Sequence, residues 1–444
     1  MAVKGKIVIL GAGKSSSYLI KYLSDWSIVN QVGLLVADIF PDALSKARAI
    51  VSTDAQSEFV LLRESDVFSL EDVVMQGTVV ISMLPVAHHY SVAQACLKYN
   101  KHLLTASYIS NELQALDKDA KQKGLTFLFE CGLDPGLDHM SAFELLDRIQ
   151  HKDEEVLSFI SVTGGLVDPA YEGDNPWQYK FTWNPRNVVL AGKGTALFRE
   201  NSLIKKIPYK HLFAHPRPLS WNGKEELEFY PNRDSFKYQE LYRLQMVQTF
   251  IRGTIRRKGY SEAWNVFVQL GMTDEEIILE GVTTYSSFLA HFVPGVWSRA
   301  ALEDKLAHPV SDDVWTKIDY LTLDAGTALN NQHKTAAAYL QEILEVKWAL
   351  NRDDKDWVLM QHRIKTIKNG VEKEYLSTLS VKGENSQYTA MAKTVGLPLA
   401  MAAVCVYNNT WREPGIHIPA DPTLYLQILA QLRKEGVVFE EQQH

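Results

Sequence analysis

A glycine-rich turn near the N-terminus has the residue types of a dinucleotide-binding loop. Gly11, Gly13 and Ser16 follow the apolar segment KIVIL at the spacing G-x-G-x-x-S. The first glycine permits a tight turn, the second lets a pyrophosphate approach the backbone, and the following helix N-terminus offers free N–H groups to the anion. Ser16 departs from the usual third glycine but is small enough for close helix–strand packing. We therefore expect this turn, with Lys14 and Ser15, to bind a nicotinamide dinucleotide, and the protein to be an oxidoreductase.

An acidic residue closes the second predicted strand. Asp38 follows the apolar segment GLLVA, where a carboxylate can accept hydrogen bonds from both ribose hydroxyls of the adenosine and repels a 2′-phosphate. The same side chain could instead cap the turn before Pro41. With the glycine-rich turn upstream, we predict the ribose contact, and therefore NAD as the preferred cofactor with NADP as the second choice.

Two further segments lie where a dinucleotide would extend. Ser82-Met83-Leu84-Pro85 ends a predicted strand near the expected switch point of the sheet, where open α/β folds bind ligands. Pro85 would end the strand and expose carbonyls to the nicotinamide ribose, although a plain strand-to-helix turn has the same residues. Asp66, after the third strand, would touch adenine or be a solvated loop carboxylate. Ser82, Leu84, Pro85 and Asp66 are thus predicted cofactor contacts.

The elements that position these residues alternate between strand and helix over the first 130 residues. Continuous apolar runs separated by helical segments predict a parallel sheet that is covered on both faces. This pattern is typical of a doubly wound α/β domain. The predicted strands are 6–10, 33–37, 58–62, 79–83, 102–105 and 126–130, and the predicted helices are 15–23, 43–50 and 89–99.

The alternation stops after residue 135. Residues 235–350 are predicted to be mostly helical, beginning with the segment YQELYRLQMVQTFI. Two antiparallel strands are expected at 358–368 and 372–381 around the turn Asn369-Gly370. Two helices follow, the first at 389–406 with an interruption at Gly396–Pro398, and the second at 422–434.

Composition narrows the class of protein. The 444 residues are 46% hydrophobic and 22% charged, the balance of a soluble globular protein of two or three domains, and the net charge of −7 argues against a nucleic-acid partner. We expect no signal peptide and no membrane partner, because no apolar run reaches 18 residues. Cys96, Cys131 and Cys405 form no CxxC pair and the histidines show no HExxH spacing, so no metal is expected. A reducing, cytoplasmic location fits these cysteines.

Four parts of the chain together resemble the saccharopine dehydrogenase family, specifically its glutamate-forming saccharopine reductases. They follow one another in family order over nearly the whole chain, and the GLDPGLDH-like segment is the most specific of them. The matching segments are ASYIS at 106–110, ECGLDPGLDH at 130–139, TGGL at 163–166 with NP at 175–176 and YKFTW at 179–183, and KTVGLP at 393–398 with GIHIP at 415–419.

The resemblance implies a reaction and an architecture. The reaction is oxidation of saccharopine by NAD(P)⁺ to glutamate and 2-aminoadipate 6-semialdehyde, or the reverse reductive condensation. The fold is α/β, with a Rossmann-like doubly wound domain, an inserted α+β substrate domain and a helical domain. The expected boundaries are 1–134 completed by about 390–444 for the first domain, 135–240 with 351–389 for the substrate and dimerisation domain, and 241–350 for the helical domain. A homodimer is the expected assembly.

A substrate with three carboxylates calls for arginines, whose planar guanidinium pairs bidentately with carboxylate. By the resemblance, Arg233 and Arg256 each bind one end of saccharopine, and Thr254 and Ile255 add backbone or hydroxyl contacts. Taken alone, Arg256 in the run from 252 to 258 would be assigned to a solvated helix face, and the resemblance favours the substrate role. Ser107 ends another strand and could donate to a substrate carboxylate or to the ribose.

The GLDPGLDH segment supplies the remaining candidates. Asp134 is expected to hold the substrate ammonium group, and Asp134, Tyr108 and a bound water are alternative proton acceptors. Tyr108 could also be a buried tyrosine with a satisfied hydroxyl, and His139 a proton carrier or a structural histidine. Further cofactor contacts are expected from the same segment and from one tryptophan, namely Leu133, Asp134, Pro135, Gly136, Asp138, His139 and Trp183.

Two other functions remain open on the sequence alone. Carboxynorspermidine and homospermidine synthases use the same imine chemistry, but a diamine substrate calls for acidic residues where this chain has Arg233 and Arg256. A non-catalytic redox sensor that binds NAD through the same fold would need neither arginine. The arginines therefore favour saccharopine over both alternatives.

Overall fold

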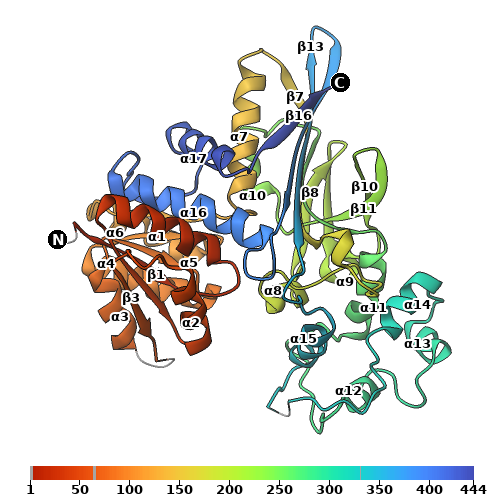
Figure 1. The fold of residues 1–444 in the computed structure, drawn as a ribbon. Helices are drawn as coiled ribbons and strands as arrows, with labels where there is room; N and C mark the ends of the chain where they lie inside the picture. Colours follow the sequence, from red (N-terminus) through yellow and green to blue (C-terminus); the bar gives the residue numbers. More distant parts are fainter. Residues whose placement is uncertain (1–3, 64–66, 331) are drawn as a thin grey trace. The chain divides into compact units, whose positions relative to one another are not determined.

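The computed structural model describes residues 4–63, 67–330 and 332–444, which form two compact units (Figure 1). The first unit combines Met1–Asp153 with Gly383–Phe439, and the second combines Glu154–Lys382 with Glu440–His444. The first unit matches the expected pairing of an N-terminal domain with a returning C-terminal segment. Its boundary lies at Asp153 instead of 134, because the helix that follows the GLDPGLDH segment packs within this unit.

The first unit contains a seven-stranded parallel sheet with the order β15-β6-β5-β4-β1-β2-β3. The order reverses direction after β1, which is the doubly wound arrangement that the alternating signals predicted. The predicted strands agree with the observed ones to within two residues at most ends. The strands are β1 Lys6–Leu10, β2 Gly33–Asp38, β3 Ser57–Leu61, β4 Val79–Ser82, β5 His102–Thr105, β6 Thr126–Leu128 and β15 Gly415–His417.

Helices cover both faces of this sheet (Figure 1). The central strands β1, β2 and β4 are mainly apolar and buried because both faces are covered, whereas β3 at the edge contains the exposed Glu58. Apolar side chains of the central strands form a core with the inner faces of the helices. The longer helices are α1 Ser17–Asn30, α2 Pro41–Ile50, α3 Val67–Gln76, α4 His89–Tyr99, α7 Leu137–Gln150, α16 Ala390–Asn408 and α17 Pro422–Lys434.

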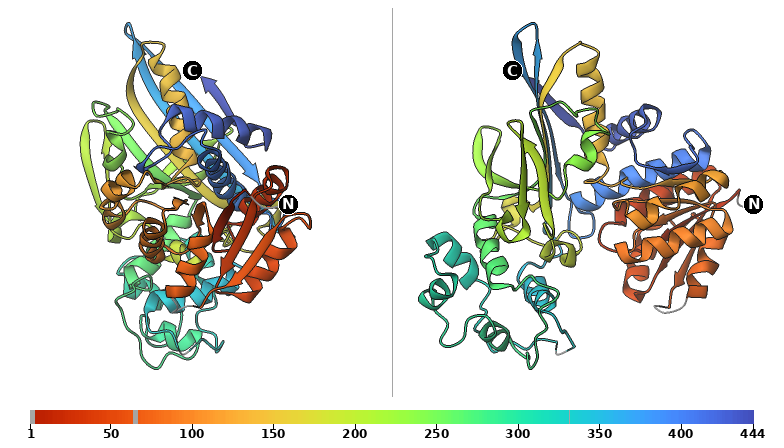
Figure 2. Two further views of the ribbon diagram at one scale, coloured as in Figure 1. Left: turned by 90° about the vertical axis from the view of Figure 1, so that its left-hand side faces the viewer. Right: turned by 180° about the vertical axis from the view of Figure 1, so that it is seen from behind.

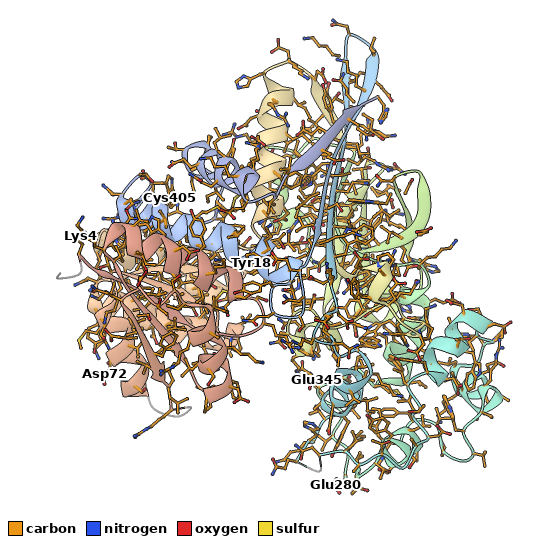
Figure 3. The ribbon with its side chains drawn as sticks, viewed as in Figure 1. Lys4, Tyr18, Asp72, Glu280, Glu345 and Cys405 are labelled. Atoms are coloured by element: carbon orange, nitrogen blue, oxygen red, sulfur yellow. The ribbon has the colours of Figure 1, made fainter. Side chains whose placement is uncertain are left out.

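The returning C-terminal segment is built into the first unit through α16. Gly396 allows α16 to approach α1 closely, since a Cβ at this position would lie 2.8 Å from the Leu19 nitrogen. Tyr18, labelled in Figure 3, donates its hydroxyl hydrogen to Glu384 Oε1 over 2.7 Å. Among the described residues, α16 is the one helix long and apolar enough to cross a membrane, and 78% of its apolar window is buried inside the protein. The predicted interruption at Gly396–Pro398 was wrong, since α16 runs on through Pro398 in this buried setting.

The second unit is organised around a nine-stranded, mostly antiparallel sheet whose main path is β10-β11-β12-β7-β13-β14-β16. The predicted hairpin is confirmed, because Asn369 and Gly370 have the positive φ values of 53° and 77° that a tight hairpin turn needs. The strands are β7 Glu155–Val167, β8 Thr195–Glu200, β9 Leu203–Pro208, β10 Arg217–Trp221, β11 Lys224–Pro231, β12 Thr249–Arg257, β13 Asp356–Lys368, β14 Val371–Lys382 and β16 Phe439–Gln443.

Helices between residues 260 and 347 gather at one end of this sheet (Figure 2). They include α11 Tyr260–Leu270 and α15 Ala336–Lys347. These helices share one hydrophobic core with the strands, so the expected separate helical domain at 241–350 is part of the second unit. The predicted helix over 238–251 was also wrong, because helical structure stops with the short α10, Phe236–Gln239, and residues 249–251 begin the buried strand β12.

Candidate active site

The glycine-rich turn has the geometry that a pyrophosphate requires. Gly11 has a φ of 97°, and a Cβ on it would lie 3.0 Å from the Met83 backbone, so only glycine fits this turn. A Cβ on Gly13, by contrast, would meet no atom within 4 Å, which leaves room beside the exposed Lys14. Ser16 is buried at the N-cap of α1 and donates its hydroxyl to the Gly13 carbonyl over 2.6 Å. A dinucleotide phosphate fits above this turn, at the positive end of the helix dipole.

Asp38 lies at the end of β2, but its carboxylate is already bonded to the protein backbone. Oδ2 accepts a hydrogen bond from the Ala12 N–H over 2.6 Å, and Oδ1 accepts one from the Phe40 N–H over 2.8 Å. The side chain is 7% exposed. Asp38 therefore ties β2 to the glycine-rich turn, which is the turn-capping role that the sequence left open. Asp66 lies outside the described residues.

A histidine that the sequence did not single out joins two neighbouring strand ends. His89 opens α4, and its Nδ1 lies 2.9 Å from Ser82 Oγ while its Nε2 lies 2.7 Å from Ser107 Oγ. Burial, followed by the nearby charge of His88, lowers the pKa of His89 to about 4, so the ring is neutral at pH 7. Ser82 is thus buried within this bridge, whereas Leu84 is only partly covered and Pro85 is exposed. The signal that could have revealed His89 is its position at the start of the helix that follows β4, at the carboxyl edge of a parallel sheet.

Tyr108 and Asp134 meet at the same carboxyl edge, beyond β5 and β6. The Tyr108 hydroxyl donates to Asp134 Oδ1 over 3.2 Å, and both side chains are partly exposed. Asp134 begins a tight turn in which the Gly132 N–H donates to the Pro135 carbonyl over 2.9 Å. A phenol and a carboxylate in contact can bind an ammonium group or pass a proton, as expected for the substrate amine.

Three ionisable side chains near Tyr108 and Asp134 are buried in the first unit. Glu130, Asp138 and His139 are each at most 1% exposed, and His139 Nε2 lies 3.1 Å from Glu130 Oε2. The expected cofactor contacts from Asp138 and His139 are therefore not available to their side chains, which are enclosed by the first unit. Leu133 is also buried, while Pro135 and Gly136 shape the turn itself.

In the second unit, Arg256 is buried without an acidic partner. Its guanidinium carbon lies 5.2, 5.8 and 5.1 Å from the ring centres of Tyr179, Tyr230 and Tyr260, and the side chain is 3% exposed. Among the residues whose side chains are described, no carboxylate lies within ion-pair distance of it, and its Nε has no hydrogen-bond partner. The expected alternative, a solvated helix face, is wrong, because Arg256 lies on the buried strand β12.

Glu228 lies opposite Arg256 on the neighbouring strand, but its carboxylate binds other groups. It is the cross-strand neighbour of Arg256 on β11, but its carboxylate accepts hydrogen bonds from the backbone of Gly259 over 2.9 Å and of Ser261 over 2.6 Å, at the start of α11. Arg256 donates from Nη1 to the Ile255 carbonyl over 2.9 Å and also shares a side-chain hydrogen bond with Tyr260. Burial opposes its charge, but the facing tyrosines raise the pKa of Arg256 above its ordinary value, so the side chain stays protonated. No described carboxylate neutralises this cation, and an anionic ligand would stabilise it further.

The other predicted substrate residues of the second unit lie around the same strands. Thr254 on β12 is paired with Thr163 on β7 and is partly exposed, and Ile255 is fully buried. Arg233 follows β11 and is exposed. Its backbone φ is 47°, a value that residues other than glycine rarely adopt. Such backbone conformations are concentrated at functional sites. Trp183 is partly buried against the core of the second unit.

Comparison with known proteins agrees with this arrangement. Residues 132–437 match the family model of the saccharopine dehydrogenase C-terminal domain, and residues 7–128 match the saccharopine dehydrogenase NADP binding domain. The chain belongs to the saccharopine dehydrogenase family. The fold resembles that of apo saccharopine dehydrogenase (L-Glu forming) from Saccharomyces cerevisiae, with a TM-score of 0.85 and 26% identity over 99% of this chain and 100% of that one.

Curated relatives fall into two groups. Saccharopine dehydrogenase [NADP(+), L-glutamate-forming] of Schizosaccharomyces pombe is 29% identical, with 98% of both chains covered. The mitochondrial alpha-aminoadipic semialdehyde synthase of Rattus norvegicus is 30% identical over all of this chain but only 48% of its own length. The chain therefore spans about half the length of the alpha-aminoadipic semialdehyde synthases that it matches.

The expected preference for NAD is not supported. The family model that matches residues 7–128 describes an NADP binding domain, and the fungal relatives are named for NADP(+). The structure explains why an aspartate at position 38 does not by itself indicate a preference for NAD. Both oxygens of Asp38 accept backbone hydrogen bonds from the protein itself, so the carboxylate does not need a ribose partner.

Proposed function

We propose that this chain is a glutamate-forming saccharopine dehydrogenase that uses NADP⁺. Its support is the family, the relatives that carry this name over nearly their whole length, and the chemistry of the two candidate sites. In the reaction, bound NADP⁺ would supply the acceptor for a hydride from the ε-carbon of the lysine skeleton, the carbon beside the secondary amine that becomes the aldehyde. Water then adds to the resulting imine, and breaking of the C–N bond releases glutamate and 2-aminoadipate 6-semialdehyde.

The observation that carries the proposal is that the buried guanidinium of Arg256 has no carboxylate partner among the described residues. A substrate carboxylate would supply the negative charge that this side chain lacks among its described neighbours, and the planar guanidinium can bind it through two parallel hydrogen bonds. The surrounding rings of Tyr179, Tyr230 and Tyr260 exclude water, which strengthens the attraction between opposite charges. Arg233, exposed after β11, is proposed to bind a second carboxylate.

Tyr108 and Asp134 are the proposed contacts for the amine. The Asp134 carboxylate, which already accepts the Tyr108 hydroxyl, would hold the protonated amine electrostatically. The amine must lose a proton before its hydride can leave, and either of these groups or a water bound between them could accept it. The glycine-rich turn and the N-terminus of α1 would hold the pyrophosphate of NADP⁺.

Homospermidine chemistry and a redox sensor both leave Arg256 without a role, whereas carboxynorspermidine has a single carboxylate, which could pair with Arg256 and would leave Arg233 without a partner in the substrate. A diamine substrate of the homospermidine type would bring positive charge to a site that already contains an unpaired cation, which is unfavourable in a desolvated cage. A redox sensor needs a dinucleotide site but no buried arginine. We therefore retain saccharopine as the proposed substrate.

The test is an assay of the purified chain with saccharopine and NADP⁺, in which NADPH is followed by absorbance and the amino acid product is identified by mass spectrometry. We expect NADPH formation with glutamate as the product in equal amount. Homospermidine and carboxynorspermidine serve as comparison substrates. Formation of lysine in place of glutamate, or turnover of the diamine conjugates alone, would contradict the proposal.

We also propose a homodimer in a reducing, cytoplasmic compartment. Leu203 and Ile204 at the start of the edge strand β9 are 60% and 65% exposed, and Lys205 and Lys206 follow them. We propose that a second chain covers these two exposed apolar side chains. All three cysteines are buried free thiols, which fits a reducing environment. Light scattering that gives a monomer mass at micromolar concentration would argue against the dimer.

A further inference from the structure

A buried group of Glu130, His139 and Asp138 connects the two loops that carry Tyr108 and Asp134. His139 lies in the middle, with Nε2 3.1 Å from Glu130 Oε2 and Nδ1 3.7 Å from Asp138 Oδ2. All three side chains are at most 1% exposed. Burying two carboxylates and an imidazole is costly unless each is bound by specific partners, so the arrangement requires an explanation beyond packing.

Glu130 holds the loop that carries Tyr108. Its Oε1 accepts a hydrogen bond from the Ile109 N–H over 3.2 Å. Its own backbone N–H donates to the Ser107 carbonyl over 3.0 Å. The side chain and the main chain of one residue thus bind the backbone immediately before and after Tyr108. Glu130 achieves this with a φ of 54°, in the left-handed region that glutamate rarely adopts.

Asp138 holds the turn that carries Asp134. Its Oδ1 accepts a hydrogen bond from the Gly136 N–H over 2.7 Å. Gly136 has a φ of 142°, and a Cβ there would lie 2.3 Å from the Gly132 backbone, so the turn is closed tightly against its own first residues. The Asp138 N–H also donates to the Leu133 carbonyl over 3.0 Å. The backbone on both sides of Asp134 is therefore held by one residue, Asp138, through its side chain and its main chain.

We infer that Glu130, His139 and Asp138 act as a positioning triad, which sets the contact between Tyr108 and Asp134 by joining their two loops through His139. The inference rests on the proposed function, because it assigns the triad to the amine-binding pair. The triad is too deeply buried to touch substrate itself. Its effect on the reaction passes through the geometry of the pair, where a displacement of about 1 Å can lower the rate on the order of 100-fold.

Substitutions that keep or remove the hydrogen bonds to Ile109 and Gly136 distinguish a positioning role from a general effect on stability. Glu130→Gln and Asp138→Asn retain an oxygen that can accept from the Ile109 or Gly136 N–H, whereas Glu130→Ala and Asp138→Ala do not. We expect each alanine variant to lower kcat with saccharopine about 10- to 100-fold, and each amide variant to recover most of the rate. The KM for NADP⁺ should stay within about twofold in all four, since the glycine-rich turn is not altered.

His139→Phe tests the link between the two arms. The ring volume is kept while both nitrogens are lost, and we expect kcat to fall about tenfold or more. The matched control is His102→Ala, which removes another buried imidazole of the first unit, one that accepts the Thr126 N–H over 3.0 Å. His102 opens β5, at the opposite end of that strand from the site, so His102→Ala should lower the unfolding temperature without the same loss of kcat.

Hydrogen exchange gives a second measurement that does not depend on the substrate. In the alanine variants, peptides covering 106–112 and 131–140 should exchange faster than in the unaltered protein, and in His102→Ala they should not. If the unaltered protein turns over saccharopine while the alanine and phenylalanine variants match it in kcat and exchange, the triad is structural and the inference is wrong. If the unaltered protein lacks this activity but the exchange pattern holds, the proposed substrate fails and the loop-positioning role remains. If an alanine variant does not fold, His139→Phe decides by the same readouts.

Discussion

At the scale of single residues, Asp38 shows how a residue type can be identified correctly and still be misread. An aspartate at the end of the second strand is where a ribose contact is expected, yet its oxygens accept the Ala12 and Phe40 N–H groups. The sequence offered both interpretations, and only coordinates could distinguish them. The remaining negative charge should nevertheless weaken binding of a 2′-phosphate.

Asp38→Asn is therefore expected to shift the ratio of NADP⁺ to NAD⁺ affinity toward NADP⁺, by about tenfold, through loss of one repulsive charge. Fluorescence titration of NADPH and NADH measures both affinities. Asp25→Asn, which removes an exposed carboxylate on α1, is the control and should leave the ratio unchanged. A shift toward NAD⁺, or no shift, would show that this carboxylate does not repel the 2′-phosphate.

His89 predicts a pH dependence of stability. The folded-state pKa is about 4, below the ordinary value of about 6.5, so between these values the unfolded chain binds a proton that the folded chain does not. Stability should therefore fall as the pH is lowered through this range, by up to about 1.4 kcal/mol per pH unit for one histidine. His89→Gln should make the dependence shallower by that amount.

The measurement is the free energy of unfolding in urea at several pH values between 4 and 7. His88→Gln, at the exposed neighbouring position, should change the slope much less. His102, whose pKa is also lowered to about 4 by burial and then by the charge of Arg412, contributes equally in all these proteins. Equal slopes for His89→Gln and the unaltered protein would contradict this account.

At the scale of elements, the sequence predicted best where burial follows a simple pattern. The central strands of the first unit are mainly apolar because helices cover both faces, and β1 and β5 begin and end where predicted. The segment 249–257 was misassigned as helix because every residue but Thr254 is buried, so neither the alternation of a half-exposed strand nor a polar helix face is visible. Arg256 was selected as a candidate through the resemblance and not through its secondary structure, and its substrate role stays a prediction.

Other site residues could not be predicted from sequence because their roles depend on contacts between distant segments. His89 is defined by Ser82 and Ser107 together. The tyrosines around Arg256 come from residues 179, 230 and 260. No local spacing brings such positions together, whereas the glycine-rich turn is contiguous and was recognised directly.

The packing of α16 against α1 gives a prediction at this scale. A Cβ at position 396 would lie 2.8 Å from the Leu19 nitrogen and 3.2 Å from its Cβ, so Gly396→Ala forces two helices apart. Overpacking of this kind costs about 1–3 kcal/mol, more than the roughly 1 kcal/mol that alanine gains over glycine within a helix. Unfolding in urea should show a net loss of stability. Gly326→Ala, where no atom lies within 4 Å, is the control, and a Gly396→Ala variant as stable as the unaltered protein would contradict the close packing.

At the scale of the whole molecule, the candidate site residues are divided between the two units. The first unit has the glycine-rich turn, the His89 bridge and the Tyr108–Asp134 pair, and the second has the caged Arg256. The C-terminal segment returns to the first unit, as the resemblance implied, while the helices after residue 260 share the core of the second. The family models divide the chain differently. The NADP binding domain model, 7–128, lies within the first unit, whereas the C-terminal domain model, 132–437, covers the second unit and also α7 and the returning segment of the first.

The most direct test of the account is the steady-state kinetics of Arg256→Ala and Arg256→Lys with saccharopine and NADP⁺. Loss of the guanidinium leaves a substrate carboxylate unpaired in a desolvated cage, which typically costs about 2–5 kcal/mol, or roughly 30- to several-thousand-fold in kcat/KM. Lysine should recover only part of this loss because an ammonium group lacks the forked contact, and the affinity for NADP⁺ should remain within about twofold in both variants. Near-normal kcat/KM for saccharopine in a folded Arg256→Ala protein would contradict the carboxylate-binding role and with it the proposed substrate.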